Sequence, residues 1–179
     1  DHGVIHRDLK AANVIVTGTG RVKIVDFGLG RRGDALMAAA TTMASVVPAG
    51  AAAGTPYAMA PEQVRGDSTD GRTDIWALGV LLYEMVGGRQ PFDGPTIPEL
   101  FSSILRDVPT PLPNTVPVEM KVVIERCLQR EPAQRYQHAG EVRDALEAIH
   151  LGTVSPWASV AYHVNRRRRV LGSAAMLLG

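Results

Sequence analysis

The stretch VIHRDLKAANVIVTGTGRVKIVDFG, residues Val4–Gly28, contains a polar cluster followed by a predicted hairpin. Two runs rich in β-branched residues, Asn13–Thr17 and Arg21–Phe27, flank a Gly-Thr-Gly sequence. This pattern predicts two antiparallel strands joined by a tight turn, in which Gly18 and Gly20 supply permissive backbone. We therefore expect a small β-hairpin directly after the polar cluster.

Polar side chains around this hairpin have the chemical types that phosphoryl transfer from ATP requires. Asp8, Lys10 and Asn13 lie on the turn that leads into the first strand, and Asp26 lies at the end of the second. A carboxylate can orient the attacking hydroxyl, a cation can neutralise the moving phosphate, and further oxygen ligands can hold magnesium. Because a hairpin would bring Asn13 and Asp26 close together, we expect them to converge on one metal ion.

The rest of the chain is predicted to be mainly helical. The run Thr73–Gly88 is apolar on nearly all sides and ends in Gly-Gly, which is typical of a buried helix with a glycine stop. Further helices are predicted at Ile97–Leu105, Pro117–Leu128 and Ala139–Ile149. The segment Leu29–Gly54 is rich in Ala, Gly, Ser and Thr and has no amphipathic period, so we predict a loop.

Composition narrows the class of protein. The 179 residues can bury one substantial core, and the net charge of +1 gives no reason to expect a nucleic-acid binder. The single cysteine, Cys127, excludes an internal disulfide framework. It lies in an apolar pattern, which favours a buried free thiol and a reducing cytoplasm.

The C-terminal sequence NRRRRVLGSAAMLLG places Arg166–Arg169 before an apolar run at 170–179. A membrane-spanning helix needs about 20 apolar residues, so this run has the length of half a span. The arginines match the charge bias of the cytoplasmic side, and anionic lipid headgroups explain them better than nucleic acid does. We expect a linker at 151–169 and the start of a membrane span at 170–179, with a basic tail as the alternative.

Five motifs in order resemble those of eukaryotic-type serine/threonine protein kinases of the bacterial style. HRDLKAAN and DFG resemble the catalytic and metal-binding loops, and GTPYAMAPE, DIWALGVLLYEM and RYQHAGEVRDAL continue the family's order. The resemblance covers Val4 to about Ile149. It implies the C-terminal lobe of the protein-kinase-like α+β fold over residues 1–150, mainly α with a small β-hairpin.

The resemblance also implies a role for each residue of the polar cluster. Asp8 would orient the substrate hydroxyl or accept its proton, and Lys10 would contact the γ-phosphate of ATP. Asn13 and Asp26 would bind Mg²⁺, or Mn²⁺ in its place. The protein substrates would present Ser or Thr, because Lys10 and Thr55 resemble the serine/threonine-specific members.

Structural support is implied for six further residues: His6, Phe27, Gly28, Glu62, Asp74 and Arg135. His6 and Phe27 would belong to a stacked apolar column, and Gly28 would let the metal-binding loop flip. Glu62 and Arg135 would form a buried ion pair. Asp74 would cap the backbone of the catalytic loop, or would simply be an acidic residue favoured at a helix N-terminus.

Regulation by phosphorylation is implied by Arg7, because an arginine beside a catalytic aspartate can pair with a phosphate on the following loop. Thr41, Thr42 and Ser45 are the candidate acceptors. Self-phosphorylation in trans would use a dimer.

One departure from the family's pattern concerns the preference for peptide substrates. The family often reads Gly-Thr-Pro-x-Tyr-Met-Ala-Pro-Glu, whereas here Tyr57 and Ala58 are exchanged.

The larger departure is that these residues contain no glycine-rich phosphate loop and no Val-Ala-x-Lys strand. We therefore expect the N-terminal lobe to be absent and the chain alone to be inactive, as a fragment of a kinase anchored in the cell membrane. Two other classes stay open: a non-catalytic lobe that acts as a protein-binding scaffold, and a small-molecule phosphotransferase. The intact polar cluster argues against the first, and the GTPYAMAPE motif with Arg135 argues against the second.

Overall fold

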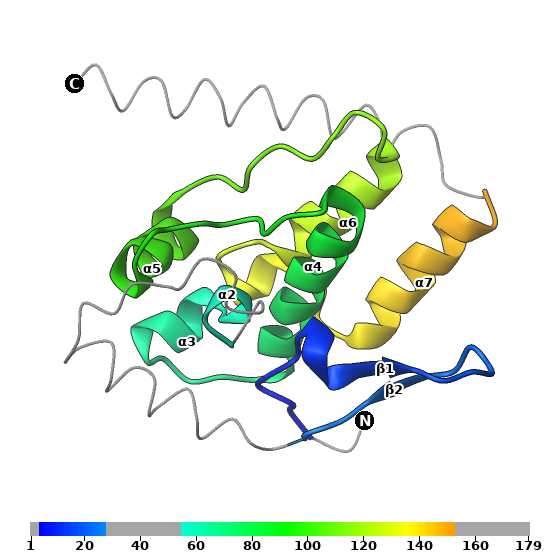
Figure 1. Cartoon of the computed structure of the whole chain (residues 1–179), viewed down its shortest axis with the longest axis horizontal. Helices are drawn as coiled ribbons and strands as arrows, with labels where there is room; N and C mark the ends of the chain where they lie inside the picture. Colours follow the sequence, from blue (N-terminus) through cyan, green and yellow to red (C-terminus); the bar gives the residue numbers. More distant parts are fainter. Residues whose placement is uncertain (1–3, 28–54, 153–179) are drawn as a thin grey trace.

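The computed structural model describes residues 4–27 and 55–152 of the chain, which form a mainly helical body with one two-stranded hairpin (Figure 1). The elements are β1 (Val14–Val16), β2 (Val22–Ile24), α2 (Thr55–Ala58), α3 (Pro61–Arg65), α4 (Gly71–Gly87), α5 (Ile97–Arg106), α6 (Val118–Cys127) and α7 (Ala139–His150), with two 3₁₀ turns, η1 (Ala11–Asn13) and η2 (Pro132–Gln134). The predicted class, mainly α with a small hairpin, is confirmed at this level.

Helix α4 lies at the centre of the helical body (Figure 1). Its start is capped by Asp70, whose side chain accepts a hydrogen bond from the Arg72 backbone, and its end is the left-handed Gly88. Trp76 and Tyr83 are almost fully buried, as the apolar pattern predicts. The pattern overstates burial at one position, because Met85 is 71% exposed.

Helix α6 packs against both α4 and α7, and two apolar clusters meet along it. Ile124 and Leu128 belong to a cluster with Trp76, whereas Cys127 belongs to a second cluster with Tyr136. The predicted buried free thiol is confirmed, and burial raises the pKa of Cys127 to about 12.

The hairpin forms where it was predicted, but its strands are shorter. Val14 pairs with Ile24 and Val16 with Val22 in an antiparallel register. The second strand ends before Asp26 because that residue takes a left-handed backbone with φ of 62°, which cannot continue an extended strand. In the turn, Gly20 requires its conformational freedom at φ of 76°.

The structure contains two short helices, α2 and α3, that the sequence pattern does not predict, because four or five residues are too few to show a helical period. The predicted loop, Gly28, Thr41, Thr42, Ser45, Arg166–Arg169 and the apolar run at 170–179 lie outside the described residues. Among the helices at 4–27 and 55–152, none is long and apolar enough to cross a membrane.

Candidate active site

Asp8 lies at the centre of the polar cluster, and its two carboxylate oxygens have different surroundings. Oδ2 accepts a hydrogen bond from Lys10 Nζ at 2.8 Å and a longer one from Asn13 Nδ2 at 3.4 Å. Oδ1 is buried and meets no hydrogen-bond donor among the described residues. A buried oxygen without a donor is costly, so Oδ1 has unused capacity to accept a hydrogen bond.

The backbone before Asp8 is held in an unusual shape by the central helix. Arg7 has a left-handed φ of 65°. Asp74, on α4, accepts the His6 amide at 2.7 Å on Oδ2 and the Arg7 amide at 2.8 Å on Oδ1, and Gln63 donates to the Arg7 carbonyl at 3.2 Å. Asp74 also stands in the first turn of α4, so the backbone contact and the helix-end position are both realised.

His6 connects this loop to the hairpin. Its Nε2 donates to the Val25 carbonyl at 2.9 Å, and its Nδ1 accepts the Asp8 amide at 3.3 Å. These partners assign the neutral ring with its proton on Nε2. The ring is buried and lies 4.6 Å from the ring of Phe27, whose own side chain is 55% exposed.

Asn13 is buried and faces Asp8, because its Nδ2 also donates to the Asp8 carbonyl at 2.8 Å. Its backbone carbonyl accepts the Val25 amide at 2.9 Å, so the hairpin brings Asn13 beside the residue that precedes Asp26. No group of three or more His, Cys, Asp or Glu that could hold a metal occurs within 4–27 and 55–152. Mg²⁺ is usually bound by one or two protein oxygens with phosphates and waters, so the oxygen donors of Asn13 and Asp26 fit this ion.

Glu62 and Arg135 form a buried ion pair between α3 and the turn after η2. Arg135 NH1 and NH2 each donate to a Glu62 oxygen at 2.7 Å, and Thr73 donates to the same carboxylate at 2.9 Å. Burial alone would raise the pKa of Glu62, but the hydrogen bonds and charge of Arg135 outweigh it and lower that pKa. The pair fastens the segment that follows residue 54 to the helical body.

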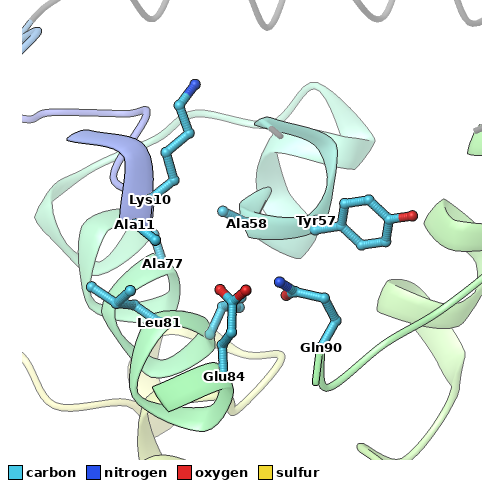
Figure 2. A pocket seen from close by; sticks show the side chains of 9 residues that line it. Lys10, Ala11, Tyr57, Ala58, Ala77, Leu81, Glu84 and Gln90 are labelled. Carbon is cyan, nitrogen blue, oxygen red and sulfur yellow. The ribbon is translucent and has the colours of Figure 1, made fainter. Parts of the chain in front are cut away.

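The remaining predicted residues lie nearby. Arg7 is exposed, and no residue in the described part of the chain pairs with its guanidinium group. Thr55 is the first residue of α2, and its side chain is not among those that the structure describes. Tyr57 and Ala58 follow on α2 and line a pocket beside Lys10 (Figure 2).

Two residues of this pocket, Glu84 and Gln90, were not predicted from the sequence. A signal for Glu84 was present, because it is a charged residue inside the otherwise apolar run Leu81–Val86. Gln90 follows the glycine stop of α4, where a polar residue is ordinary, so the sequence carries no signal for it.

Comparison with known proteins identifies the family. The family model for the protein kinase domain matches residues 1–148. The serine/threonine-protein kinase PknA of Mycobacterium tuberculosis is 36% identical over 86% of this chain and 34% of its own length. PknB of the same organism is 36% identical over 97% of this chain and 27% of its own length. PknB of Mycobacterium leprae is 36% identical over 84% of this chain and 24% of its own length. The chain therefore spans about a third or less of these relatives, and it belongs to the protein kinase domain family, with similarity to bacterial serine/threonine kinases.

Proposed function

We propose that the protein transfers the γ-phosphate of ATP to serine or threonine side chains of protein substrates. The observation that carries this proposal is the Asp8 carboxylate, one oxygen of which is held by Lys10 and Asn13 while the other is buried without a donor among the described residues. The similarity to serine/threonine kinases supports the same substrate class.

In the proposed reaction, the substrate hydroxyl donates a hydrogen bond to Asp8 Oδ1. Its oxygen attacks the γ-phosphorus, its proton passes to Asp8, and the bond from the γ-phosphorus to the bridging oxygen breaks, so that ADP leaves. Lys10, which contacts Asp8 at 2.8 Å, places a positive charge next to the transferred group. Positioning and charge neutralisation supply most of the rate enhancement in reactions of this kind.

Asn13 and Asp26 would hold the metal ion. The Asn13 amide nitrogen is engaged with Asp8, which leaves its side-chain oxygen for a cation. Asp26 is exposed on the left-handed turn after β2, where its carboxylate is open to a ligand. Mg²⁺, or Mn²⁺ in its place, would neutralise the charge of the phosphates when bound.

We further propose that residues 1–150 are the C-terminal lobe of the kinase domain and that this chain alone is inactive. These residues supply the groups for the γ-phosphate and the metal, but none of the sequence motifs that cover the nucleotide or pair with its other phosphates. The scaffold alternative predicts protein binding without phosphoryl transfer. Asp8, Lys10, Asn13 and Asp26 speak against it, since binding alone does not require that set.

The test measures phosphate transfer from ATP to Ser, Thr and Tyr peptides by the protein made from its complete coding sequence. Asp8→Asn should lower kcat by about a hundredfold to ten-thousandfold, because it removes the proton acceptor. Asp144→Asn, in an exposed pair with Arg143 on α7, is the matched control and should have little effect. Equal rates for Asp8→Asn and the unmodified protein would contradict the proposed role of Asp8.

The 179-residue chain is assayed in parallel. We expect no transfer from it, whereas transfer that depends on Asp8 would show that the proposed inactivity is wrong. If the complete protein binds partners but transfers no phosphate to any peptide, the scaffold function replaces the enzyme.

A further inference from the structure

The peptide unit between Arg7 and Asp8 sets the direction in which the Asp8 side chain leaves the backbone. Arg7 has a left-handed φ of 65°, a conformation that neighbouring groups must hold in place. The two hydrogen bonds from Asp74 end on the amides of His6 and Arg7, which both precede this peptide unit. The peptide unit itself is therefore held by other contacts.

Two side chains contact the two ends of the Arg7–Asp8 peptide unit. Its amide, on Asp8, donates to His6 Nδ1 at 3.3 Å. Its carbonyl, on Arg7, accepts from Gln63 Nε2 at 3.2 Å. His6 belongs to the same loop, whereas Gln63 lies on α3, 56 positions along the chain. Gln63 is thus the contact that fixes this peptide unit relative to a helix of the body.

The orientation of the Gln63 amide group is set by the start of its own helix. Its Oε1 accepts the amide of Ala60, the N-cap residue of α3, at 2.9 Å. Because only the oxygen of a side-chain amide can accept, this contact turns Nε2 toward the Arg7 carbonyl. A glutamine at the third helical position commonly bonds the N-cap amide, and here its other end remains for the catalytic loop.

Helix α3 is itself held firmly in the molecule. The neighbour of Gln63, Glu62, accepts hydrogen bonds at 2.7 Å from both terminal nitrogens of the buried Arg135. On the other side, Val64 is buried in the larger apolar cluster. A donor on a helix fixed in this way can limit rotation of the peptide unit that precedes Asp8.

We propose that Gln63 is a positioning residue for Asp8: its amide holds the Arg7–Asp8 peptide unit so that the carboxylate faces the substrate hydroxyl. The inference rests on the proposed kinase function and names a further residue of the same site. Gln63 acts through Asp8 and contacts neither ATP nor substrate in this scheme. A misplacement of about 1 Å can cost about a hundredfold in rate, so a side chain outside the site can control the reaction.

The test uses Gln63→Glu in the protein made from its complete coding sequence. The variant keeps an oxygen for the Ala60 amide, and an acidic residue is favoured in the first turn of a helix, so α3 should keep its stability. The second oxygen would face the Arg7 carbonyl in place of a donor. We expect kcat to fall by about tenfold, with KM for ATP within about twofold and the urea midpoint unchanged.

Gln129→Glu is the matched control, because it also removes an amide donor from a backbone carbonyl, that of Glu125 at 2.8 Å. This contact lies at the end of α6, and kcat should stay unchanged. The same Gln63→Glu change is then made together with Asp8→Asn. Because the group that Gln63 positions is then altered, the further loss of rate should be less than about twofold.

An unchanged kcat for Gln63→Glu alone would overturn the positioning role while leaving the kinase function intact. An equal tenfold loss with and without Asp8→Asn would also overturn it, since a general structural defect acts in both backgrounds.

Amide hydrogen exchange in the 179-residue chain gives a readout independent of catalysis. The Asp8 amide lies on the held peptide unit, so we expect it to exchange about tenfold faster in Gln63→Glu and at an unchanged rate in Gln129→Glu. If the complete protein transfers no phosphate, the kinase proposal fails on its own. In that case faster exchange at Asp8 in Gln63→Glu still supports the link from α3, and equal exchange overturns it.

Discussion

Arg7 and Asp26 are the two non-glycine residues with positive φ in the part of the chain that the structure describes, and they lie on either side of Asp8 and Asn13. A strained backbone of this kind costs about 1–3 kcal/mol per residue, so surrounding contacts must hold it. At Arg7 those contacts come from Asp74 and Gln63. Strain held in place beside the candidate catalytic carboxylate is consistent with a preorganised site.

At this scale we predict that Asp74→Asn destabilises the protein by about 2 kcal/mol. The carboxylate accepts two backbone amides, from His6 and Arg7, whereas an asparagine would turn an NH₂ group toward one of them. Urea unfolding of the 179-residue chain, followed by tryptophan fluorescence, measures the loss. Asp144→Asn, whose partner Arg143 is exposed, should leave the unfolding midpoint nearly unchanged. Equal midpoints for the two variants would show that Asp74 does not hold the turn.

The candidate site could be predicted in part from single residues. Asp8, Lys10 and Asn13 stand at short, fixed offsets, so local chain geometry alone keeps them together. The left-handed backbone at Arg7 could not be predicted, because it is imposed by Asp74 from 67 positions away. The Glu84 pocket was missed for a similar reason, since its walls come from three separate elements.

At the scale of elements, Arg135 joins α3 to the start of α4. All five of its N–H donors have acceptors: two oxygens of Glu62 and the carbonyls of Gln129, Arg72 and Arg130. The guanidinium group also lies 5.1 Å from the ring of Trp76. A planar group with five fixed donors is required for this arrangement, which a lysine cannot reproduce.

We predict that Arg135→Lys destabilises the protein by about 3–5 kcal/mol, although it preserves the charge. The lysine would leave carbonyls and part of the buried Glu62 carboxylate without donors. Thermal and urea unfolding measure the loss, and Arg143→Lys at an exposed position is the matched control. A small effect of Arg135→Lys, comparable with the control, would mean that charge alone holds the pair.

The pH dependence of unfolding gives a second readout of the same pair. Because the folded protein lowers the pKa of Glu62 below its ordinary value of 4.5, the stabilisation is fully present above that value. It is lost as the pH falls through the lower folded pKa. Glu62→Gln should therefore show a weaker loss of stability between about pH 5 and pH 3 than the unmodified chain. Parallel curves would contradict this assignment.

Elements long enough to show a period could be predicted from sequence, and shorter ones could not. Helices α4 to α7 begin and end within two residues of their predicted bounds. Asp70 and the left-handed Gly88 mark the two ends of α4, and Thr96 caps the start of α5. Helices α6 and α7 have no side-chain cap at their starts, and their C-cap residues are not glycines, so their apolar period is what makes them predictable. Helices α2 and α3 depend on tertiary contacts, including the Glu62–Arg135 pair, that no local pattern reveals.

At the scale of the whole molecule, α6 contributes residues to both apolar clusters. Gly79 of α4 determines how closely α4 and α6 approach each other. A Cβ atom at Gly79 would lie 2.6 Å from the Cβ of Cys127 and 3.2 Å from Leu128. No real side chain tolerates that approach, so α4 or α6 would have to shift. Cys127 therefore reports on the integrity of the whole core.

We predict that alkylation of Cys127 follows global unfolding. The thiol is fully buried, and burial raises its pKa to about 12, so the folded protein presents almost no reactive thiolate. Gly79→Ala should cost about 1–3 kcal/mol through overpacking and raise the alkylation rate by about ten- to a hundredfold. Gly140→Ala, on α7 with open space around the added methyl, should slow alkylation slightly, because alanine favours a helix. Rates measured with iodoacetamide at equal pH, alongside urea midpoints, test the link. If alkylation is fast and its rate is the same in both variants and in the unmodified chain, α6 opens locally while the rest of the molecule stays folded.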